Sequence, residues 1–144
     1  MQSVLMVCVG NICRSPMAEM LLRARLTEQG TVVASAGVGA LVGHGVDPQV
    51  QRLMMERGLD ASMHRARQLS SEMALNSDLI LTMNRDLKQH IEAMFPETKG
   101  RVQRLGHWGG FDIPDPFQRP SVIFEQARAL IDQALDEWCD KLWN

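Results

Sequence analysis

Short apolar runs and longer stretches of helical spacing alternate along the chain. The apolar runs occupy residues 3–9, 32–36, 78–83 and 102–105. A continuous apolar run of this length is typical of a strand that is buried on both faces of a parallel sheet. The pattern therefore predicts four strands.

Helical patterns separate the predicted strands. The first begins at Ser15–Pro16, which have the residue types of an N-cap and a first helical position, and it stops at Gly30. Asp47–Pro48 gives the same start signal for a helix that runs to about Gly58. Three more helices are predicted over 70–76, over 84–95 and from Pro120 onward.

Strands that alternate with helices predict an α/β fold, in which right-handed crossovers place helices on both faces of the sheet. At 144 residues the chain is long enough for one domain with a sizeable core and short for two. We therefore predict a single domain, 1–144, with a doubly wound four-stranded parallel sheet. Ligands of such folds bind at the carboxyl ends of the strands, and the stretch VCVGNICRSP (7–16) lies at one of these ends.

Composition excludes several classes of protein. The 15 basic and 17 acidic residues nearly balance, so neither disorder nor nucleic-acid binding is indicated. The longest apolar runs are far shorter than the roughly 18 residues of a membrane span, and the start lacks the pattern of a signal peptide. We expect a cytoplasmic protein without membrane insertion. Its three cysteines fit neither a disulfide framework nor a zinc site, and we expect no metal and no cofactor.

The stretch after the first strand has the chemistry of a phosphate-binding loop. Five residues separate Cys8 from Arg14, and a helix starts directly afterwards. Amides that turn inward, together with a helix N-terminus, bind an anion, and an arginine fork holds two phosphate oxygens. Gly10 permits close approach of the backbone, and Asn11 tolerates the left-handed conformation of a tight loop. The predicted loop residues are Val9, Gly10, Asn11, Ile12, Cys13 and Ser15.

Cys8 is the candidate nucleophile of this loop. The helix N-terminus and Arg14 favour a thiolate over a thiol, and Ser15 is placed to donate a hydrogen bond to the sulfur. Such a thiolate attacks phosphorus and forms a phosphocysteine intermediate. The alternative is an inert cysteine at a strand end, which is the usual fate of a free thiol. The accompanying Gly-Asn and Ser-Pro steps favour the phosphate loop.

The other two cysteines have less defined roles. Cys13 either contributes only its amide, or is a resolving thiol that captures oxidised Cys8 in a disulfide; we favour the second. Cys139, on the last helix, is expected to have no chemistry.

When Cys8 attacks phosphorus, the alkoxide or phenoxide that leaves needs a proton. The loop supplies none, so a general acid must come from elsewhere in the chain. Asp115 lies between two prolines, which stiffen the loop that holds it. Asp-Pro is also a common turn signal, and taken alone that simpler interpretation would be preferred.

Five motifs along the chain favour a general acid over a simple turn residue at Asp115. They are CVGNICRSP (8–16), SAG (35–37), HRARQ (64–68), DLILTM (78–83) and DPF (115–117). With these motifs, in this order, the chain resembles the low-molecular-weight protein tyrosine phosphatases, especially the bacterial branch associated with capsule and exopolysaccharide export. The resemblance implies that Cys8 is the nucleophile, that Arg14 clamps the phosphate, and that Asp115 is the acid and then the base. It implies a supporting polar network of Asn11, Ser15, Ser35 and His64.

The chain departs from the family at the rim of the expected cleft. Phe117 stands where the family often has a tyrosine, so this position can stack on a ring but cannot be phosphorylated. Leu41, in the glycine-rich loop 37–48, is the candidate for the opposite wall. We place neither His44 nor Trp108 in the site.

The resemblance implies a phosphatase for phosphotyrosine proteins, whose natural substrate is the tyrosine-rich tail of a bacterial kinase that controls polysaccharide export. Two alternatives stay open at this point. One is an arsenate reductase of the same fold, for which Cys139 is a poorly placed relay cysteine. The other is a binding module that captures phosphotyrosine without hydrolysing it, against which Asp115 argues.

Overall fold

The computed structural model describes residues 1–143 and contains one parallel sheet with the strand order β2–β1–β3–β4. The strands are β1 (Ser3–Cys8), β2 (Val32–Gly37), β3 (Leu79–Thr82) and β4 (Val102–Arg104). The helices are α1 (Arg14–Arg25), α2 (Pro48–Met55), α3 (Ser71–Asn76), α4 (Arg85–Met94) and α5 (Ser121–Leu142), with a 3₁₀ turn, η1, at Pro96–Thr98. The predicted fold class is confirmed, and each predicted strand and helix has a counterpart.

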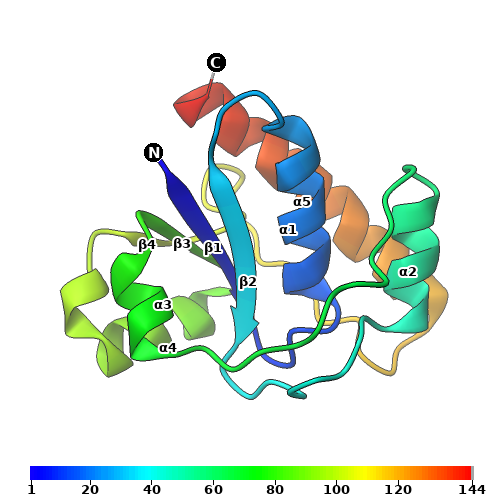
Figure 1. The fold of residues 1–144 in the computed structure, drawn as a ribbon, viewed down its shortest axis with the longest axis horizontal. Coiled ribbons are helices and arrows are strands. Elements are labelled where there is room, and N and C mark those ends of the chain that lie inside the picture. Colours follow the sequence, from blue (N-terminus) through cyan, green and yellow to red (C-terminus); the bar gives the residue numbers. More distant parts are fainter. Residues whose placement is uncertain (144) are drawn as a thin grey trace.

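Helices cover both faces of this sheet (Figure 1). Helices α1, α2 and α5 pack on one face, and α3 and α4 lie on the other. Alternate residues of β1 point to the two faces: Met6 and Cys8 belong to the core under α1 and α5, whereas Leu5 and Val7 belong to the opposite core. This two-sided burial is why the first strand is a continuous apolar run.

The chain reverses its direction of winding at β1. One edge of β1 pairs with β2, in a register that places Cys8 opposite Gly37, and the other edge pairs with β3. The crevice at the carboxyl end of such a strand is the usual ligand site of open α/β sheets. The loop that leaves β1 at Cys8 opens into this crevice.

The start of α1 differs from the prediction. The helix begins at Arg14 with Cys13 at the N-cap, and no side chain caps it. The hydroxyl of Ser15, predicted as the cap, is instead bonded within the loop to the Cys8 thiol and the Asn11 amide. Pro16 still fits the first turn, where its missing N–H has no intrahelical partner to lose.

The other helix starts follow their sequence signals. Asp47 accepts a hydrogen bond from the Gln49 amide at 2.9 Å, so the Asp-Pro start of α2 is confirmed. Ser70 and Asn84 cap α3 and α4 in the same way, by accepting from the amides of Met73 and Leu87.

The long helix α5 closes the side of the sheet that bears α1. Asp132 on α5 accepts a hydrogen bond from Arg25 of α1 at 3.0 Å and another from Arg57, which follows α2. Burial opposes ionisation of Asp132, but these hydrogen bonds hold the pKa of its carboxyl below the usual range. Within residues 1–143, neither α5 nor another helix has an apolar stretch long enough to span a bilayer.

Candidate active site

The main chain of residues 8–12 turns its carbonyl oxygens outward, into hydrogen bonds with neighbouring segments. Three consecutive carbonyls accept from amides of the segment 38–41, at 3.0–3.1 Å. The next two accept from Nε2 of His64 at 2.8 Å and from the amide of Asp47 at 3.0 Å. Because N–H and C=O point in opposite directions in a trans peptide, the amides of residues 9–13 are directed toward the inside of the loop.

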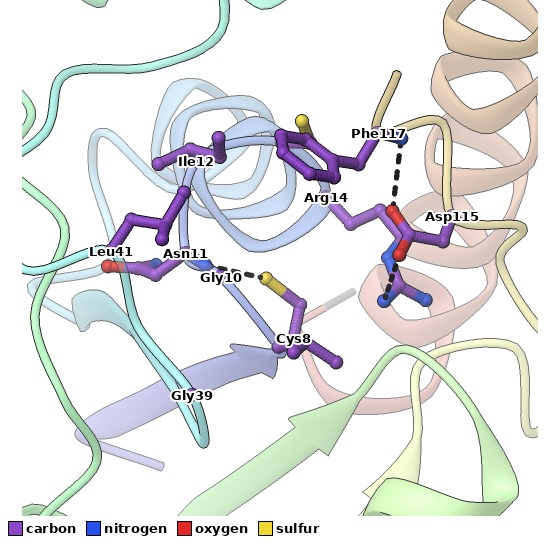
Figure 2. A pocket seen from close by; sticks show the side chains of 11 residues that line it. Cys8, Gly10, Asn11, Ile12, Arg14, Gly39, Leu41, Asp115 and Phe117 are labelled. Atoms are coloured by element: carbon purple, nitrogen blue, oxygen red, sulfur yellow. Dashed lines mark hydrogen bonds and ion pairs between the residues drawn. The ribbon is translucent and has the colours of Figure 1, made fainter. Parts of the chain in front are cut away.

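The sulfur of Cys8 lies where these amides converge. The amide of Asn11 donates to Cys8 Sγ at 3.3 Å, and the hydroxyl of Ser15 lies 2.8 Å from the same sulfur. Figure 2 shows the first of these bonds at the base of the pocket. Inward amides and the N-terminus of α1 together form an anion-binding concavity directly above the thiol.

Asn11 organises the loop from its interior. It is completely buried and has a φ of 60°, the left-handed conformation predicted for it. Its Oδ1 accepts from the Arg67 amide at 3.0 Å, so its Nδ2 is the donor to Ser15 Oγ at 2.8 Å and to Ser35 Oγ at 3.0 Å. With its oxygen engaged by Asn11, Ser15 has its own proton free to donate to the Cys8 sulfur.

The network continues behind the loop. Ser35 donates to Oε1 of Glu19 at 2.5 Å, and Arg67 donates from Nε to the Ser35 carbonyl at 2.9 Å. The structure thus brings together the four predicted network positions. Sequence reasoning missed the roles of Glu19 and Arg67, although Arg67 lies within the HRARQ motif. Glu19 has no local signal, since it looks like an ordinary polar helix residue.

Arg14 and Asp115 face each other across the mouth of the loop. Arg14 is 3% exposed, and its Nη1 donates to the carbonyl of Ile113 at 3.0 Å, which holds the guanidinium in place. Its Nη2 lies 3.8 Å from Oδ2 of Asp115. The other oxygen of Asp115 accepts from the amide of Phe117 at 3.1 Å, while the side chain remains 53% exposed. A carboxyl group so placed has access both to the pocket and to water.

A pocket with a volume of about 170 Å³ joins these groups. Figure 2 shows Leu41 and Ile12 on one side of it and Phe117 with Asp115 on the other, with Cys8 at its base. The predicted wall residues Leu41 and Phe117 both line the pocket, whereas His44 and Trp108 do not. Gly39 also lines it and was not predicted.

The remaining thiols differ in surroundings. Burial, reinforced by the negative charge of Asp47 and the nearby Cys8, strongly raises the pKa of Cys13, so this side chain stays protonated at neutral pH. Cys139 lines a different pocket, next to Arg25, and burial raises its pKa as well. Cys8 and Cys139 therefore line separate pockets. The structure does not bring them together for the disulfide relay that an arsenate reductase would need.

The crowded glycine of the site is Gly37 rather than Gly10. A Cβ at Gly10 would lie 3.8 Å from Cγ1 of Ile12, an ordinary contact. A Cβ at Gly37 would lie 2.3 Å from the carbonyl oxygen of Val9 and 3.1 Å from the amide nitrogen of Asn11. The strand and the loop can approach this closely only because residue 37 lacks a side chain.

Known proteins match the chain over nearly its whole length. "Probable low molecular weight protein-tyrosine-phosphatase EpsP" of Ralstonia solanacearum is 44% identical over 141 residues, covering 98% of this chain and 96% of its own. Wzb of Escherichia coli K12, named a low molecular weight protein-tyrosine-phosphatase, is 43% identical over 144 residues, with coverages of 97% and 95%.

Solved structures agree with the fold. Wzb from Escherichia coli K30, in complex with sulphate, has a TM-score of 0.92 and 38% identity, with 98% of each chain covered. Wzb from Vibrio vulnificus, in complex with benzylphosphonate, has a TM-score of 0.92 and 37% identity, with 98% of this chain and 99% of its own covered. The family profile "Low molecular weight phosphotyrosine protein phosphatase" matches residues 3–144. The chain belongs to this family.

Proposed function

We propose that the protein hydrolyses phosphotyrosine in proteins through a phosphocysteine intermediate. The observation that carries the proposal is the convergence of a thiol, inward amides, a buried guanidinium and a carboxyl group on one pocket. All of these groups line that pocket, which supports the proposal. The phosphate rests on the amides of residues 9–13 and on Arg14, directly above Cys8 Sγ.

In the first step the Cys8 thiolate attacks phosphorus. The S–P bond forms as the bond from phosphorus to the phenolic oxygen breaks, and Asp115 transfers its proton to that oxygen. Arg14 follows the equatorial oxygens into the transition state, because its fork donates two parallel hydrogen bonds. Ser15 stabilises the sulfur as an anion, both before attack and when it leaves.

In the second step water attacks the phosphocysteine. Asp115, now a carboxylate, accepts a proton from the water as the new O–P bond forms and the S–P bond breaks. Inorganic phosphate leaves and the Cys8 thiolate is restored. The open side of Asp115, which is half exposed, supports this role because water reaches it directly.

The depth of the pocket supports an aryl phosphate as the substrate class. Cys8 is 3% exposed at the base, while Leu41 and Phe117 are 39% and 41% exposed at the rim. A phosphate on the sulfur would therefore project its ester group between two apolar side chains, which suits a phenyl ring better than the shorter serine side chain.

The physiological substrate we propose is the phosphorylated tyrosine-rich C-terminal tail of a bacterial tyrosine kinase that regulates exopolysaccharide production. This proposal is supported by the resemblance to EpsP and Wzb, which are named as tyrosine phosphatases. It places the protein in the cytoplasm, where such a tail would be accessible.

Replacement of Asp115 tests the chemistry. Asp115→Ala should lower the turnover of an aryl phosphate by roughly 10²–10⁴, because the leaving phenoxide loses its proton donor. The affinity for inorganic phosphate should stay close to that of the parent, since the amides and Arg14 are untouched. The exposed Asp140, far along α5, supplies the control variant Asp140→Ala, which should keep full activity. Equal turnover in Asp115→Ala and the parent would refute the assignment.

A parallel assay separates the remaining candidates. A phosphatase hydrolyses the aryl phosphate without a thiol reductant and does not turn over arsenate. Turnover of arsenate that depends on a thiol would support a reductase instead, and binding of phosphotyrosine without hydrolysis would support a binding module.

A further inference from the structure

The segment 38–41 forms one wall of the pocket and is held along both of its edges. On the inner edge its amides donate to the carbonyls of residues 8–10. On the outer edge it faces the chain around Gln68, which lies in a parallel bridge with Gly37. Beyond this bridge no strand of the described residues 1–143 continues alongside the segment, yet its outward backbone groups are still paired.

The side chain of Gln68 supplies this pairing. Its Nε2 donates to the carbonyl of Val38 at 2.8 Å, and its Oε1 accepts from the amide of Ala40 at 2.9 Å. One side-chain amide thus replaces the two backbone groups of an adjacent strand. The two partners also fix which end of the amide faces which residue, since a carbonyl needs a donor and an N–H needs an acceptor.

The residues next to these two hydrogen bonds line the pocket. Gly39 lies between the two bonded residues, and Leu41 follows directly after them. Leu41 is the apolar side chain that faces Phe117 across the mouth in Figure 2. A displacement of Val38 or Ala40 would therefore move the wall on which the substrate ring rests.

We propose that Gln68 is a positioning residue for substrate recognition: by pairing with Val38 and Ala40 it holds Leu41 at the distance from Phe117 that an aromatic ring requires. This inference rests on the proposed function, because it assigns the wall to the aryl group of the substrate. Gln68 itself is exposed and touches no reacting atom. The phosphate subsite has supports that involve neither Gln68 nor the segment 38–41, because the carbonyls of Asn11 and Ile12 are bonded to Nε2 of His64 and to the amide of Asp47.

Replacement of Gln68 should separate ring recognition from phosphate binding. In Gln68→Ala we expect KM for an aryl phosphate to rise about fivefold with kcat nearly unchanged, since ground-state and transition-state contacts with the ring weaken together. The inhibition constant of inorganic phosphate, which lacks a ring, should stay at the parent value. Gln126→Ala, an exposed glutamine on α5, is the matched control and should behave as the parent.

A second variant tests the hydrogen bond that Gln68 donates to the Val38 carbonyl. Gln68→Glu keeps an acceptor for the Ala40 amide but sets a carboxylate oxygen against the Val38 carbonyl, so KM should rise at least as much as in Gln68→Ala. A protonated carboxyl regains a donor, so the ratio of KM in this variant to KM in the parent should fall as the pH approaches about 4.5.

The outcomes distinguish this inference from the proposed function. A parent protein that hydrolyses no aryl phosphate would overturn the proposed function. An active parent with unchanged KM in Gln68→Ala, or with equal losses of aryl phosphate and inorganic phosphate affinity in that variant, would overturn only the positioning role of Gln68.

Discussion

Gly37 offers a direct test of how closely the loop amides must be placed. The substitution Gly37→Ala adds a Cβ 2.3 Å from the carbonyl oxygen of Val9 and 3.1 Å from the amide nitrogen of Asn11. Both neighbours are backbone atoms, so no rotation of a side chain relieves the contact. Because a Cβ does not approach an oxygen to less than 3.0 Å, strand and loop must separate by about 0.7 Å.

This separation of strand and loop also moves the amides that bind the anion. The carbonyl of Val9 and the amide of Gly10 belong to one planar peptide, so moving the first tilts the second. A misplacement of about 1 Å at a reacting centre costs roughly 10² in rate, and we expect a similar fall in kcat/KM for an aryl phosphate. Overpacking should also lower the free energy of unfolding by about 1–3 kcal/mol, which a domain of ordinary stability survives.

Steady-state kinetics and thermal unfolding followed by circular dichroism give both quantities. Gly45→Ala is the matched control in the same loop region, because its Cβ would lie 3.7 Å from the nearest atom, Nη1 of Arg65. It should keep parental kinetics and a parental melting temperature. A folded Gly37→Ala with a parental kcat/KM would refute the argument that outward carbonyls fix the position of the inward amides.

Two further predictions concern the charge on the sulfur and the packing of α5. Ser15→Ala removes the hydroxyl that donates to Cys8, so alkylation of Cys8 by iodoacetate at pH 6 should slow and kcat/KM should fall about tenfold; unchanged alkylation would show that the hydroxyl does not stabilise the thiolate. Asp132→Asn should cost about 1–2 kcal/mol in urea unfolding at pH 7, because the amide that replaces the carboxylate carries no charge to offer Arg25 and Arg57. A lowered carboxyl pKa stabilises the fold above its unfolded value of about 3.9 and loses that effect as the pH falls through the folded value, so the difference between variant and parent should shrink below about pH 4. A difference that stays constant down to that pH would contradict the assignment.

Local patterns predict the elements of this fold well, since each depends on neighbours in the sequence. Continuous apolar runs identify strands buried on both faces, and Asp47, Ser70 and Asn84 identify helix starts through bonds to amides two or three residues away. Ser15 is the exception, because a competing partner, the Cys8 thiol, takes its hydroxyl. That competition depends on the turn of the loop, which no spacing rule describes.

The support of the site depends on contacts between distant parts of the chain. Arg67 meets Asn11 across 56 positions, and Gln68 meets Ala40 across 28. Gly37 is crowded only because β2 lies against β1 in one register, with Cys8 opposite. Sequence motifs indicate that such residues matter, but their physical roles appear only when the sheet is assembled.

Asn11 is a fully buried polar residue in the loop that follows the apolar strand β1. A buried polar group is costly unless each of its donors and acceptors is paired, and Asn11 meets this condition with its amide, its carbonyl and both ends of its side chain. Each of these bonds helps to fix the loop in one conformation before any phosphate arrives. Preorganised donors do not need to reorient as charge develops in the transition state, which is the main source of their catalytic effect. At Asn11 the sequence therefore departs from apolar patterning. A rigid polar loop there serves the reaction, whereas an apolar side chain would add only packing.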